Sequence, residues 1–400
     1  MGQFIKRLAV SFEPLALLLL RYTEGAMILR ILLIISFYFV SSAVAANEFD
    51  VALQTAYRER VVMRRAISAN LRWLQSPRGR ALYMKFHKTQ RGGPSREMIL
   101  RSLQRLQAVT ASRSQKEFMA AMRRDFLLWQ PSVQAAHFTG YFEPVYEARR
   151  QPDARFRWPL YGLPNLAQWP RPHPTRLQLE GGDGKKQSPL LRGHALAYLP
   201  SRFQAYLVQV QGSARLRFPD KVVAVGYAGR TQWNYTGIGR ELINDGKIPF
   251  EQLTQQSLLA YFRAHPHELN NYLPRNKRFV FLRPTKGRPA TGALGIPLVA
   301  GRSMATDKTS LPPGAVALAS VPLRNPLTAR VFGNGHLSRL LFDHDTGGAI
   351  KGPARVDIFM GSGTQAGERA GALNAVGMLN YLLLKSDAVR LKSGRTLPLN

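Results

Sequence analysis

The sequence predicts a mainly β-sheet protein with helices at its front and in its middle. Residues 48–130 carry apolar residues at the three- and four-residue spacing of helices. From His137 onward, short apolar or aromatic runs alternate with Gly, Pro and Asn, which is typical of strands and turns. Helical spacing returns at residues 249–273. With 400 residues, of which 45% are hydrophobic, the chain can bury the cores of two or three domains.

Two patterns define the front helices. Apolar residues within Met98–Leu106 recur on one helical face. Ser114, followed three residues later by Glu117, is a capping-box pattern that predicts the start of a second helix. We expect Pro131 to end that second helix, because proline cannot continue the helical hydrogen-bond ladder.

The remaining elements are predicted from local composition and spacing. The polar, Gly- and Pro-rich residues 171–186 predict a surface loop. Residues 249–273 predict two short helices that are split at Pro266. A final helix is expected over Gln365–Ala375, followed by an apolar run from Met378 to Leu384. Strands and turns are predicted at residues 138–150, 156–164, 206–218, 222–230, 234–242, 279–284, 295–301, 315–323 and 329–332.

Composition excludes some chemistry. The chain has no cysteine, so a disulfide framework, a thiolate zinc site, a cysteine nucleophile and a lipid-modified cysteine are excluded. Lys and Arg number 56 against 24 Asp and Glu, a net charge of +32 that predicts attraction to a polyanion. Nucleic acid, an anionic membrane face and a wall polymer with carboxylates would all attract a chain of this charge. The cellular compartment of the protein is needed to distinguish among these partners.

The N-terminus predicts export. In Met27–Asn47, a basic residue (Arg30) precedes the apolar run Ile31–Val40 and small residues that end at Ala45, the layout of a secretory signal with cleavage after Ala45 or one residue later. An uncleaved N-terminal anchor is the alternative. Residues 1–26 form either a long leader or a segment that precedes the true start at Met27. Removal of residues 1–46, with four basic and two acidic residues, leaves a net charge of +30, and export disfavours a nucleic-acid partner.

Asp357 is the strongest candidate for chemistry. It lies between the apolar residues Val356 and Ile358, so a strand would place its side chain on the opposite face from theirs. Burial of a carboxyl group raises its pKa and keeps it protonated, as a general acid requires. The alternative is a structural acceptor of backbone hydrogen bonds, and spacing alone favours that alternative.

Other catalytic patterns are weak. Asp345-Thr-Gly resembles an aspartic protease motif, but it occurs once, so a second copy of the chain would be required. The polar Asp343 and His344 also precede it where an apolar strand is usual. The eight histidines have no HExxH-type spacing, so no metal site is expected. No phosphate-binding or dinucleotide-binding pattern is present, and no cofactor is expected.

Aromatic residues gather near the start of the β region and again at residues 227–235. Their flat apolar faces suit a sugar-binding platform. Ordinary core packing is the alternative, and we expect it for more than half of them. The residues are Tyr141, Phe142, Tyr146, Trp158, Tyr161, Tyr227, Trp233 and Tyr235.

Seven ordered motifs stand out in the sequence, at residues 138–144, 158–164, 210–217, 225–229, 235–242, 345–352 and 356–359. Together they resemble the lytic murein transglycosylase A family. The resemblance runs from His137 to Leu384, and its last part resembles the three-aspartate domain of that family, with Asp307, Asp345 and Asp357 as the aspartates.

The resemblance implies a two-domain architecture. A double-psi β-barrel domain is built from segments before and after an inserted smaller β domain, and the glycan lies in the groove between them. On this sequence the implied boundaries are a leader at 1–46, front helices with the first barrel strand at 47–146, the insert at 147–277 and the three-aspartate domain at 278–400.

The resemblance also implies an activity and its residues. The family cleaves the β-1,4 bond between N-acetylmuramic acid and N-acetylglucosamine in peptidoglycan and forms 1,6-anhydromuramic ends. Asp357 would be its single catalytic carboxylate, supported by Asp345, Asp307 and Lys351. The substrate-binding residues would be Thr139, Gly140, Tyr141, Gln211, Ser213, Tyr227 and Gly361.

The expected partner is therefore the peptidoglycan glycan strand, in the periplasm, and not nucleic acid. The family is often anchored by a lipid on cysteine, which this chain lacks, so membrane association would be through the N-terminus. A non-catalytic peptidoglycan-binding protein is the alternative function. Neither protein partners nor an exo or endo mode of cleavage is predicted by the sequence.

Overall fold

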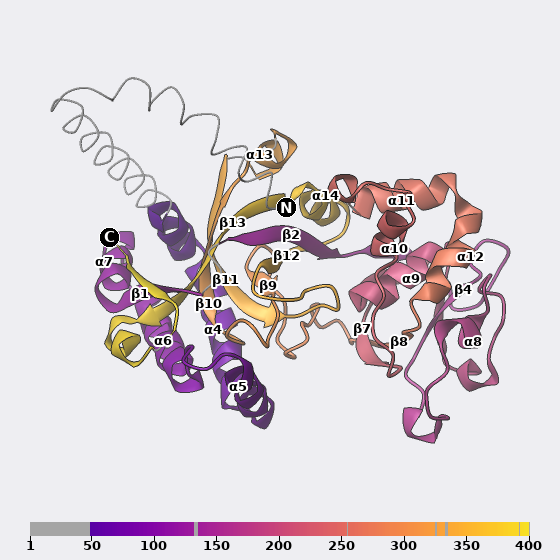
Figure 1. Cartoon of the computed structure of the whole chain (residues 1–400), viewed down its shortest axis with the longest axis horizontal. Coiled ribbons are helices and arrows are strands. Elements are labelled where there is room, and N and C mark those ends of the chain that lie inside the picture. The colour runs from indigo at the N-terminus through magenta and orange to yellow at the C-terminus, as the bar shows by residue number, and fades with distance from the viewer. Residues whose placement is uncertain are drawn as a thin grey trace, which may run out of the picture.

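The computed structural model describes residues 49–131, 135–253, 255–324, 326–332, 335–391 and 393–399. Two bodies lie side by side in Figure 1, one built on a large sheet and one on smaller sheets with helices. The signal segment and leader expected at residues 1–46 lie outside the described residues. Among the helices within those ranges, none is long and apolar enough to cross a membrane.

Four described helices cover one side of the large sheet (Figure 1): α4 (Arg60–Gln75), α5 (Pro77–Thr89), α6 (Arg96–Val109) and α7 (Gln115–Asp125). Each of the last three begins at a serine whose hydroxyl accepts a backbone N–H from the first turn. At α7 the predicted cap is confirmed, because the Ser114 hydroxyl accepts the N–H of Glu117. The Glu117 carboxylate accepts the N–H of Arg113 instead of that of Ser114, so the reciprocal half of the box is displaced by one residue.

The prediction that Pro131 ends this helix is wrong. The helix ends at Asp125, and β1 (Phe126–Gln130) follows at once with all five residues buried. Strand β1 pairs with both β13 (Asn374–Leu384) and β14 (Arg395–Pro398), so tertiary pairing overrides the local helical pattern.

The large sheet has the strand order β10-β11-β9-β12-β2-β13-β1-β14, and β10 also pairs with β13. Most neighbours are antiparallel, but β2 pairs with β12 and β9 pairs with β11 in parallel. The other strands of this sheet are β2 (Ala136–Glu143), β9 (Ser303–Ala305), β10 (Val316–Pro322), β11 (His336–Asp345) and β12 (Arg355–Ser362). Helices α13 (Pro326–Phe332) and α14 (Thr364–Ala372) accompany them.

The second body contains a four-stranded sheet, a two-stranded sheet and short helices. The first sheet has the order β3 (Val145–Glu147), β6 (Ser213–Arg217), β7 (Val222–Arg230) and β8 (Val280–Pro284). The second pairs β4 (Trp158–Tyr161) with β5 (Ala195–Leu199). The helices are α8 (Arg176–Glu180), α9 (Arg202–Gln211), α10 (Ile238–Asn244), α11 (Gln255–Ala264) and α12 (Leu269–Tyr272).

Three predictions in this body are wrong in part. Residues 206–211, expected as strand, belong to α9, which Ser201 caps at its start and Gly212 ends in a left-handed conformation (φ 74°). Helix α10 occupies most of the segment expected as strand and turns at 234–242, and α8 lies within the loop expected at 171–186. The helical break at Pro266 is confirmed, since α11 ends at Ala264 and a short 3-10 turn begins at Pro266.

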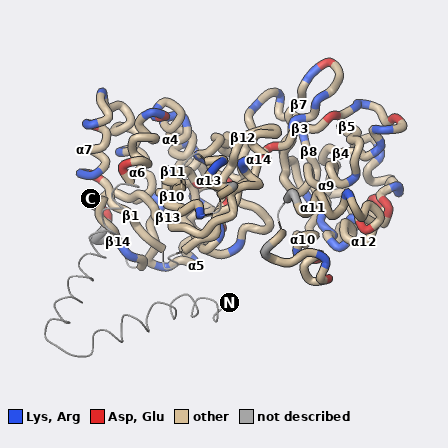
Figure 2. Tube along the Cα trace, turned by 90° about the horizontal axis from the view of Figure 1, so that it is seen from above, with Lys and Arg blue, Asp and Glu red and all other residues tan. Residues whose placement is uncertain are grey.

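Lys and Arg positions occur along the chain in both bodies, as Figure 2 shows. Both bodies therefore contribute Lys and Arg to the positive charge of the protein. A long polyanion could be attracted from many directions, and this attraction is screened by salt.

Gly377 marks a close crossing of β13 and β10. A Cβ atom there would lie 2.5 Å from the Ser320 carbonyl oxygen and 2.8 Å from the Val321 Cα. We predict that Gly377→Val lowers the free energy of unfolding by about 1–3 kcal/mol, since backbone atoms would have to move. Urea unfolding measures this. Gly335→Ala is the control, because nothing lies within 4 Å of a Cβ there. Equal free energies of unfolding for the two variants would contradict the close backbone contact at Gly377.

Candidate active site

The candidate site lies on one face of the parallel pair β2–β12. The register places Asp357 opposite Thr139, with Arg355 opposite His137 two residues earlier and Phe359 opposite Tyr141 two residues later. Because side chains alternate along a strand, these six side chains share one face. Val356 and Ile358 are buried on the other face, as the sequence pattern predicted.

The Asp357 carboxyl lies in a mixed electrostatic environment. Its side chain is 19% exposed, and one oxygen lies 3.4 Å from Arg355 Nη2. Burial raises the pKa of Asp357, and nearby Asp345 raises it further, whereas the positive charge of Arg355 lowers it. Burial prevails, so the pKa of Asp357 is held above its ordinary value and the protonated form is favoured.

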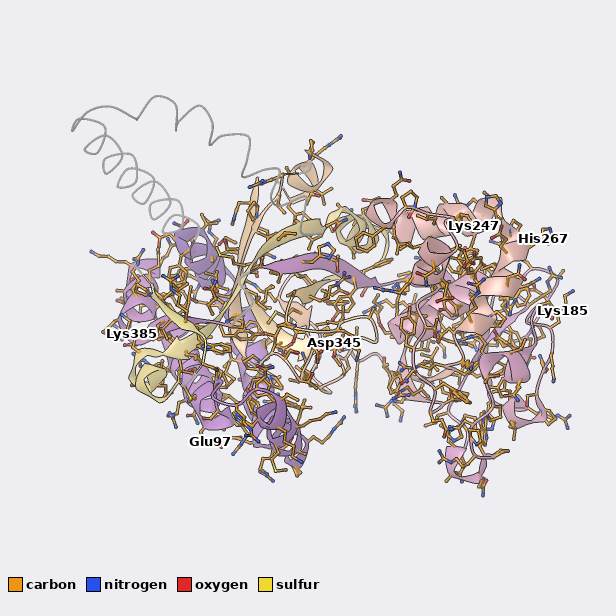
Figure 3. All side chains as sticks on the ribbon, viewed as in Figure 1. Glu97, Lys185, Lys247, His267, Asp345 and Lys385 are labelled. Atoms are coloured by element: carbon orange, nitrogen blue, oxygen red, sulfur yellow. The ribbon has the colours of Figure 1, made fainter. Side chains whose placement is uncertain are left out.

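Asp345 is engaged through both carboxylate oxygens. Its Oδ2 accepts the Tyr141 hydroxyl at 2.8 Å, and its Oδ1 accepts the N–H groups of Ala293 at 2.7 Å and Thr346 at 2.8 Å. Burial raises the pKa of Asp345 although these hydrogen bonds oppose it. The residue therefore ties Tyr141 on β2 to the end of β11, and Figure 3 shows it on the side of the large sheet toward the second body.

Asp307 holds the far end of the glycine-rich loop 346–352. Its carboxylate accepts the N–H and hydroxyl of Thr309 and the N–H of Gly352. Burial alone would raise the pKa of Asp307, but these hydrogen bonds and the charge of Lys351 together bring it below its ordinary value. Lys351 is exposed and acts through this charge.

The loop also contacts the second body. A Cβ at Gly348 would lie 3.1 Å from Cβ of Tyr235, so this position has little room for a side chain. A second link is the buried Glu143 at the end of β2. Its Oε2 accepts Arg215 Nε of β6 at 2.9 Å and the hydroxyl of Ser362 of β12 at 2.5 Å.

The structure divides the other predicted site residues into two groups. Thr139 and Tyr141 lie beside Asp357, whereas Gly140 packs on α14, where a Cβ would lie 2.6 Å from Ala370 Cα. Gly361, at φ 108°, has a backbone conformation that favours glycine near the end of β12.

Gln211, Ser213 and Tyr227 form the second group, in the second body. Gln211 is the last residue of α9, and Ser213 begins β6 opposite Gly226. Tyr227 is 49% exposed, the most open of the eight aromatic residues considered above. Only Tyr161 of those eight is buried, so the expectation that more than half would be core residues is wrong.

The sequence reading missed a buried polar network behind the site. Lys308 Nζ contacts Oδ1 of Asp343, and both groups bond the hydroxyl of Thr306. Burial raises the pKa of Asp343 to about 6, while Lys308 and Thr306 oppose the shift. The signals that could have indicated this network are an Asp-His pair before the Asp-Thr-Gly motif and a lysine next to Asp307.

His344 belongs to the same buried layer. Its Nε2 lies 2.6 Å from Asn70 Oδ1, and its Nδ1 lies 2.7 Å from the Ser303 hydroxyl. The Asn70 amide nitrogen donates to the carbonyl oxygen of Gly314, which identifies the other amide atom as the oxygen Oδ1. Because Oδ1 can only accept, His344 Nε2 carries the hydrogen and donates it to Asn70. Burial, helped by the Lys308 charge, lowers the pKa of His344 to about 3, and the ring stays neutral.

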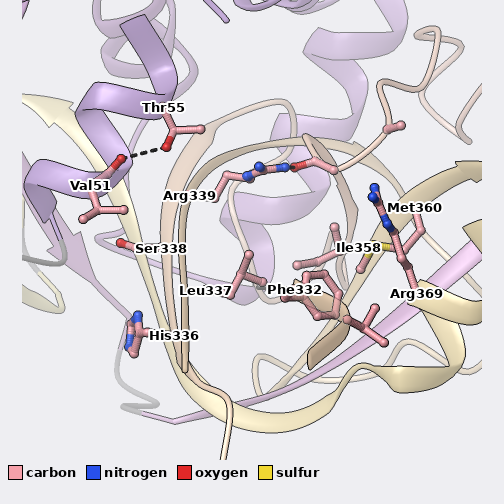
Figure 4. Close-up of a pocket in the computed structure, with 13 residues that line it drawn as sticks. Val51, Thr55, Phe332, His336, Leu337, Ser338, Arg339, Ile358, Met360 and Arg369 are labelled. Atoms are coloured by element: carbon pink, nitrogen blue, oxygen red, sulfur yellow. Dashed lines mark hydrogen bonds between the residues drawn. The ribbon is translucent and has the colours of Figure 1, made fainter. Parts of the chain in front are cut away.

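A cavity of about 260 Å³ lies on the opposite face of β12 (Figure 4). Ile358 and Met360, which line it, alternate with Asp357 and Phe359 and so point away from them. The cavity is therefore separate from the candidate site. Within the described ranges, no group of three or more His, Asp or Glu side chains could hold a metal ion.

Comparisons with known proteins support the resemblance noted in the sequence. Residues 137–283 match the family described as MltA specific insert domain, and residues 302–383 match the 3D domain. A membrane-bound lytic murein transglycosylase A of Escherichia coli K12 is 34% identical over 260 residues, which cover 64% of this chain and 68% of the relative. The chain belongs to the lytic murein transglycosylase A family.

A relative of the same name from Vibrio cholerae is 36% identical over 255 residues, or 62% of this chain and 66% of that protein. The aligned part of the chain thus spans about two thirds of the length of these curated family members.

Solved structures of the family share the fold. The membrane-bound lytic murein transglycosylase of Agrobacterium tumefaciens has a TM-score of 0.64 at 26% identity, over 80% of this chain and 96% of that one. Escherichia coli MltA with bound chitohexaose has a TM-score of 0.60 at 26% identity, over 80% and 89%. The prediction of a sheet-rich protein with N-terminal helices is confirmed.

We predict that His344 makes stability sensitive to acid. The unfolded chain binds a proton at this residue below about pH 6.5, whereas folded His344, with a pKa of about 3, does not until far lower pH. Between pH 6.5 and 5 the wild type should lose about 2 kcal/mol of unfolding free energy through this group. His344→Gln should remove most of that loss in urea unfolding.

The exposed His267 supplies the control, as His267→Gln should leave the pH dependence unchanged. Asp343, whose pKa of about 6 favours the folded state in acid, is present in all three proteins and cancels in the comparison. An identical pH dependence for wild type and His344→Gln would contradict a buried neutral His344.

Proposed function

We propose that the protein is a peptidoglycan lytic transglycosylase with Asp357 as its single catalytic carboxylate. It cleaves the β-1,4 bond between N-acetylmuramic acid and N-acetylglucosamine, forms 1,6-anhydromuramic ends and serves cell wall turnover. The observation that carries the proposal is the contrast between two neighbouring aspartates. Burial raises the pKa of both, but Asp345 uses both oxygens in three hydrogen bonds, whereas the side chain of Asp357 is 19% exposed and its Oδ1 lies 3.4 Å from Arg355.

Protonated Asp357 acts first as a general acid. It gives its proton to the glycosidic oxygen while the bond from that oxygen to C1 of the muramyl ring breaks, and positive charge develops on the ring. The carboxylate then accepts the proton of the muramyl C6 hydroxyl as that oxygen attacks C1. Glycosidases that use water need a second carboxylate. An intramolecular hydroxyl replaces the activated water, because proximity supplies its effective concentration.

The other predicted residues are assigned supporting and binding roles in this proposal. Asp345 and Asp307 hold the two ends of the loop 346–352, and Lys351 contributes charge near Asp307. Thr139, Gly140, Tyr141 and Gly361 would bind or shape the glycan site from the large sheet. Gln211, Ser213 and Tyr227 would bind it from the second body.

We also assign the domains implied by the family. Residues 147–277 would form the inserted domain, flanked by 47–146 and 278–400, with the glycan groove between the bodies. The six strands β10, β11, β9, β12, β2 and β13 would correspond to the double-psi barrel. In support, β10 pairs with β13, and two parallel pairs occur among mostly antiparallel neighbours.

The proposed substrate is the glycan strand of peptidoglycan in the periplasm. The binding of chitohexaose by Escherichia coli MltA supports an elongated sugar-polymer substrate for this family fold. The signal-like segment before Asn47 supports export, and any membrane association would be through the N-terminus. A non-catalytic peptidoglycan-binding protein remains the second candidate, because the same groove could bind glycan without cleavage.

We predict that wild-type protein releases 1,6-anhydromuropeptides from purified sacculi and that Asp357→Asn lowers this activity by about a thousandfold or more. An amide of nearly the same shape cannot donate the acid proton. Mass spectrometry of the soluble products measures it. Asp220→Asn is the matched control, since Asp220 is 54% exposed in an ion pair with Arg150, and it should retain full activity.

The two candidate functions separate in this experiment. A wild-type protein that pellets with sacculi without releasing product would support the binding protein. An Asp357→Asn variant as active as wild type would refute Asp357 as the catalytic carboxylate. Hydrolysed, reducing muramyl ends would instead indicate a water nucleophile.

A further inference from the structure

Arg355 lies beside the proposed acid and belongs to none of the residues that the sequence reading selected. Its Nη2 donates to the Thr139 hydroxyl at 3.0 Å and lies 3.4 Å from Oδ1 of Asp357. Its Nη1 lies 3.1 Å from Nδ1 of His137. The side chain is 32% exposed, so it is held by these contacts although it borders solvent.

The chemistry of these groups fixes the direction of each hydrogen bond. Arginine only donates, so Nδ1 of His137 must accept from Arg355. Nε2 of His137 then carries the hydrogen and donates it to Oδ1 of Asn374. His137 is therefore neutral in this arrangement, with its tautomer set by Asn374.

The resulting chain crosses three neighbouring strands. Asn374 on β13 holds His137 on β2, and His137 holds Arg355 on β12, two residues before Asp357. Asn374 also lies opposite Thr139, the second acceptor of Arg355, in the β13–β2 register. The guanidinium is thus fixed at two separate points before it meets Asp357.

We propose that Arg355 is a positioning residue for Asp357, held against the carboxyl group by His137 and Asn374. The proposal rests on the function proposed above, in which Asp357 transfers the proton. Arg355 would fix the direction of the acid and stabilise the carboxylate that remains once the proton has left. Its positive charge would also limit the rise in the pKa of Asp357 that burial causes. Asp357 would then stay protonated at rest and still be a strong enough acid to react.

The other charged and titratable groups near Asp357 come from each strand packed around it. Asp345 at the end of β11 favours the protonated form of Asp357, while Arg355 on β12 favours the ionised form. His137 on β2 is neutral while it accepts from Arg355, and it would favour the ionised form only when protonated. Tyr141 on β2 is a neutral phenol whose hydroxyl donates to Asp345. On the other side, β9 places the uncharged Ala305 opposite Asp357. Arg355 is the permanent cation among these groups, and it makes a direct contact.

The first test measures the protonation of Asp357 directly. The titration of its carboxyl carbon is followed by NMR in protein labelled with ¹³C-aspartate, and Asp357→Asn identifies the resonance. Arg355→Gln should raise the midpoint by about 1 pH unit, because a contacting positive charge is lost. His137→Leu, which removes the acceptor that holds Arg355, should give a smaller shift in the same direction. Arg395→Gln, at an exposed position on the outer strand β14, should give none.

The second test follows anhydromuropeptide release against pH. Arg355→Gln should move the alkaline limb upward by the same amount and lower kcat about tenfold, with KM little changed, since positioning acts on the reacting group. A rise in KM with unchanged pH profile and carboxyl titration would overturn the proposal and make Arg355 a residue that binds an anionic group of the substrate.

Two further outcomes remain decisive. If Arg355→Gln does not fold, Arg355→Lys keeps the charge but loses the planar fork, so kcat should fall with little change in the Asp357 midpoint. Wild-type kcat in that variant would overturn the positioning role. If the wild type itself releases no anhydromuropeptides, the proposed function fails, while the NMR titration still decides whether Arg355 acts on Asp357.

Discussion

The parallel pairing of β2 with β12 is the interaction on which the rest of the site depends. It joins residues 137–141 to residues 355–359, so the two strands belong to segments on either side of the second body. The pairing places Asp357 beside Thr139 and Arg355 beside His137, and it brings Tyr141 to Asp345. A shift of one residue would turn Asp357 toward the core, where Val356 and Ile358 now pack.

Within that frame, opposing electrostatic effects of burial and charge define the behaviour of Asp357. Burial and the neighbouring Asp345 favour the protonated carboxyl, and Arg355, which His137 holds in place, favours the carboxylate. Burial prevails, so the protonated carboxyl is favoured, as the proposed general acid requires. Asp345 is instead fixed by three hydrogen bonds, and Asp307 by the backbone on the far side of the loop. Three aspartates thus have three different environments.

The sequence predicted what depends on local pattern and known motifs. The alternation around Asp357, the serine cap of α7 and the break at Pro266 are all local features, and the structure contains them. The strand at residues 126–130 was missed because its pairing partners lie more than 240 residues later. Helix α9 was missed because its β-branched and aromatic residues suit a strand equally well, and Ser201 with Gly212 decides the outcome.

The same limit applies to the site. Arg355 was one basic residue among many in the sequence, and its role depends on a register that places it beside His137. The most direct test of the account is a crystal structure of Asp357→Asn with a bound glycan oligosaccharide. The account predicts a glycosidic oxygen within hydrogen-bond distance, about 3 Å, of the side chain at position 357. A glycan bound elsewhere, with position 357 uncovered, would contradict it.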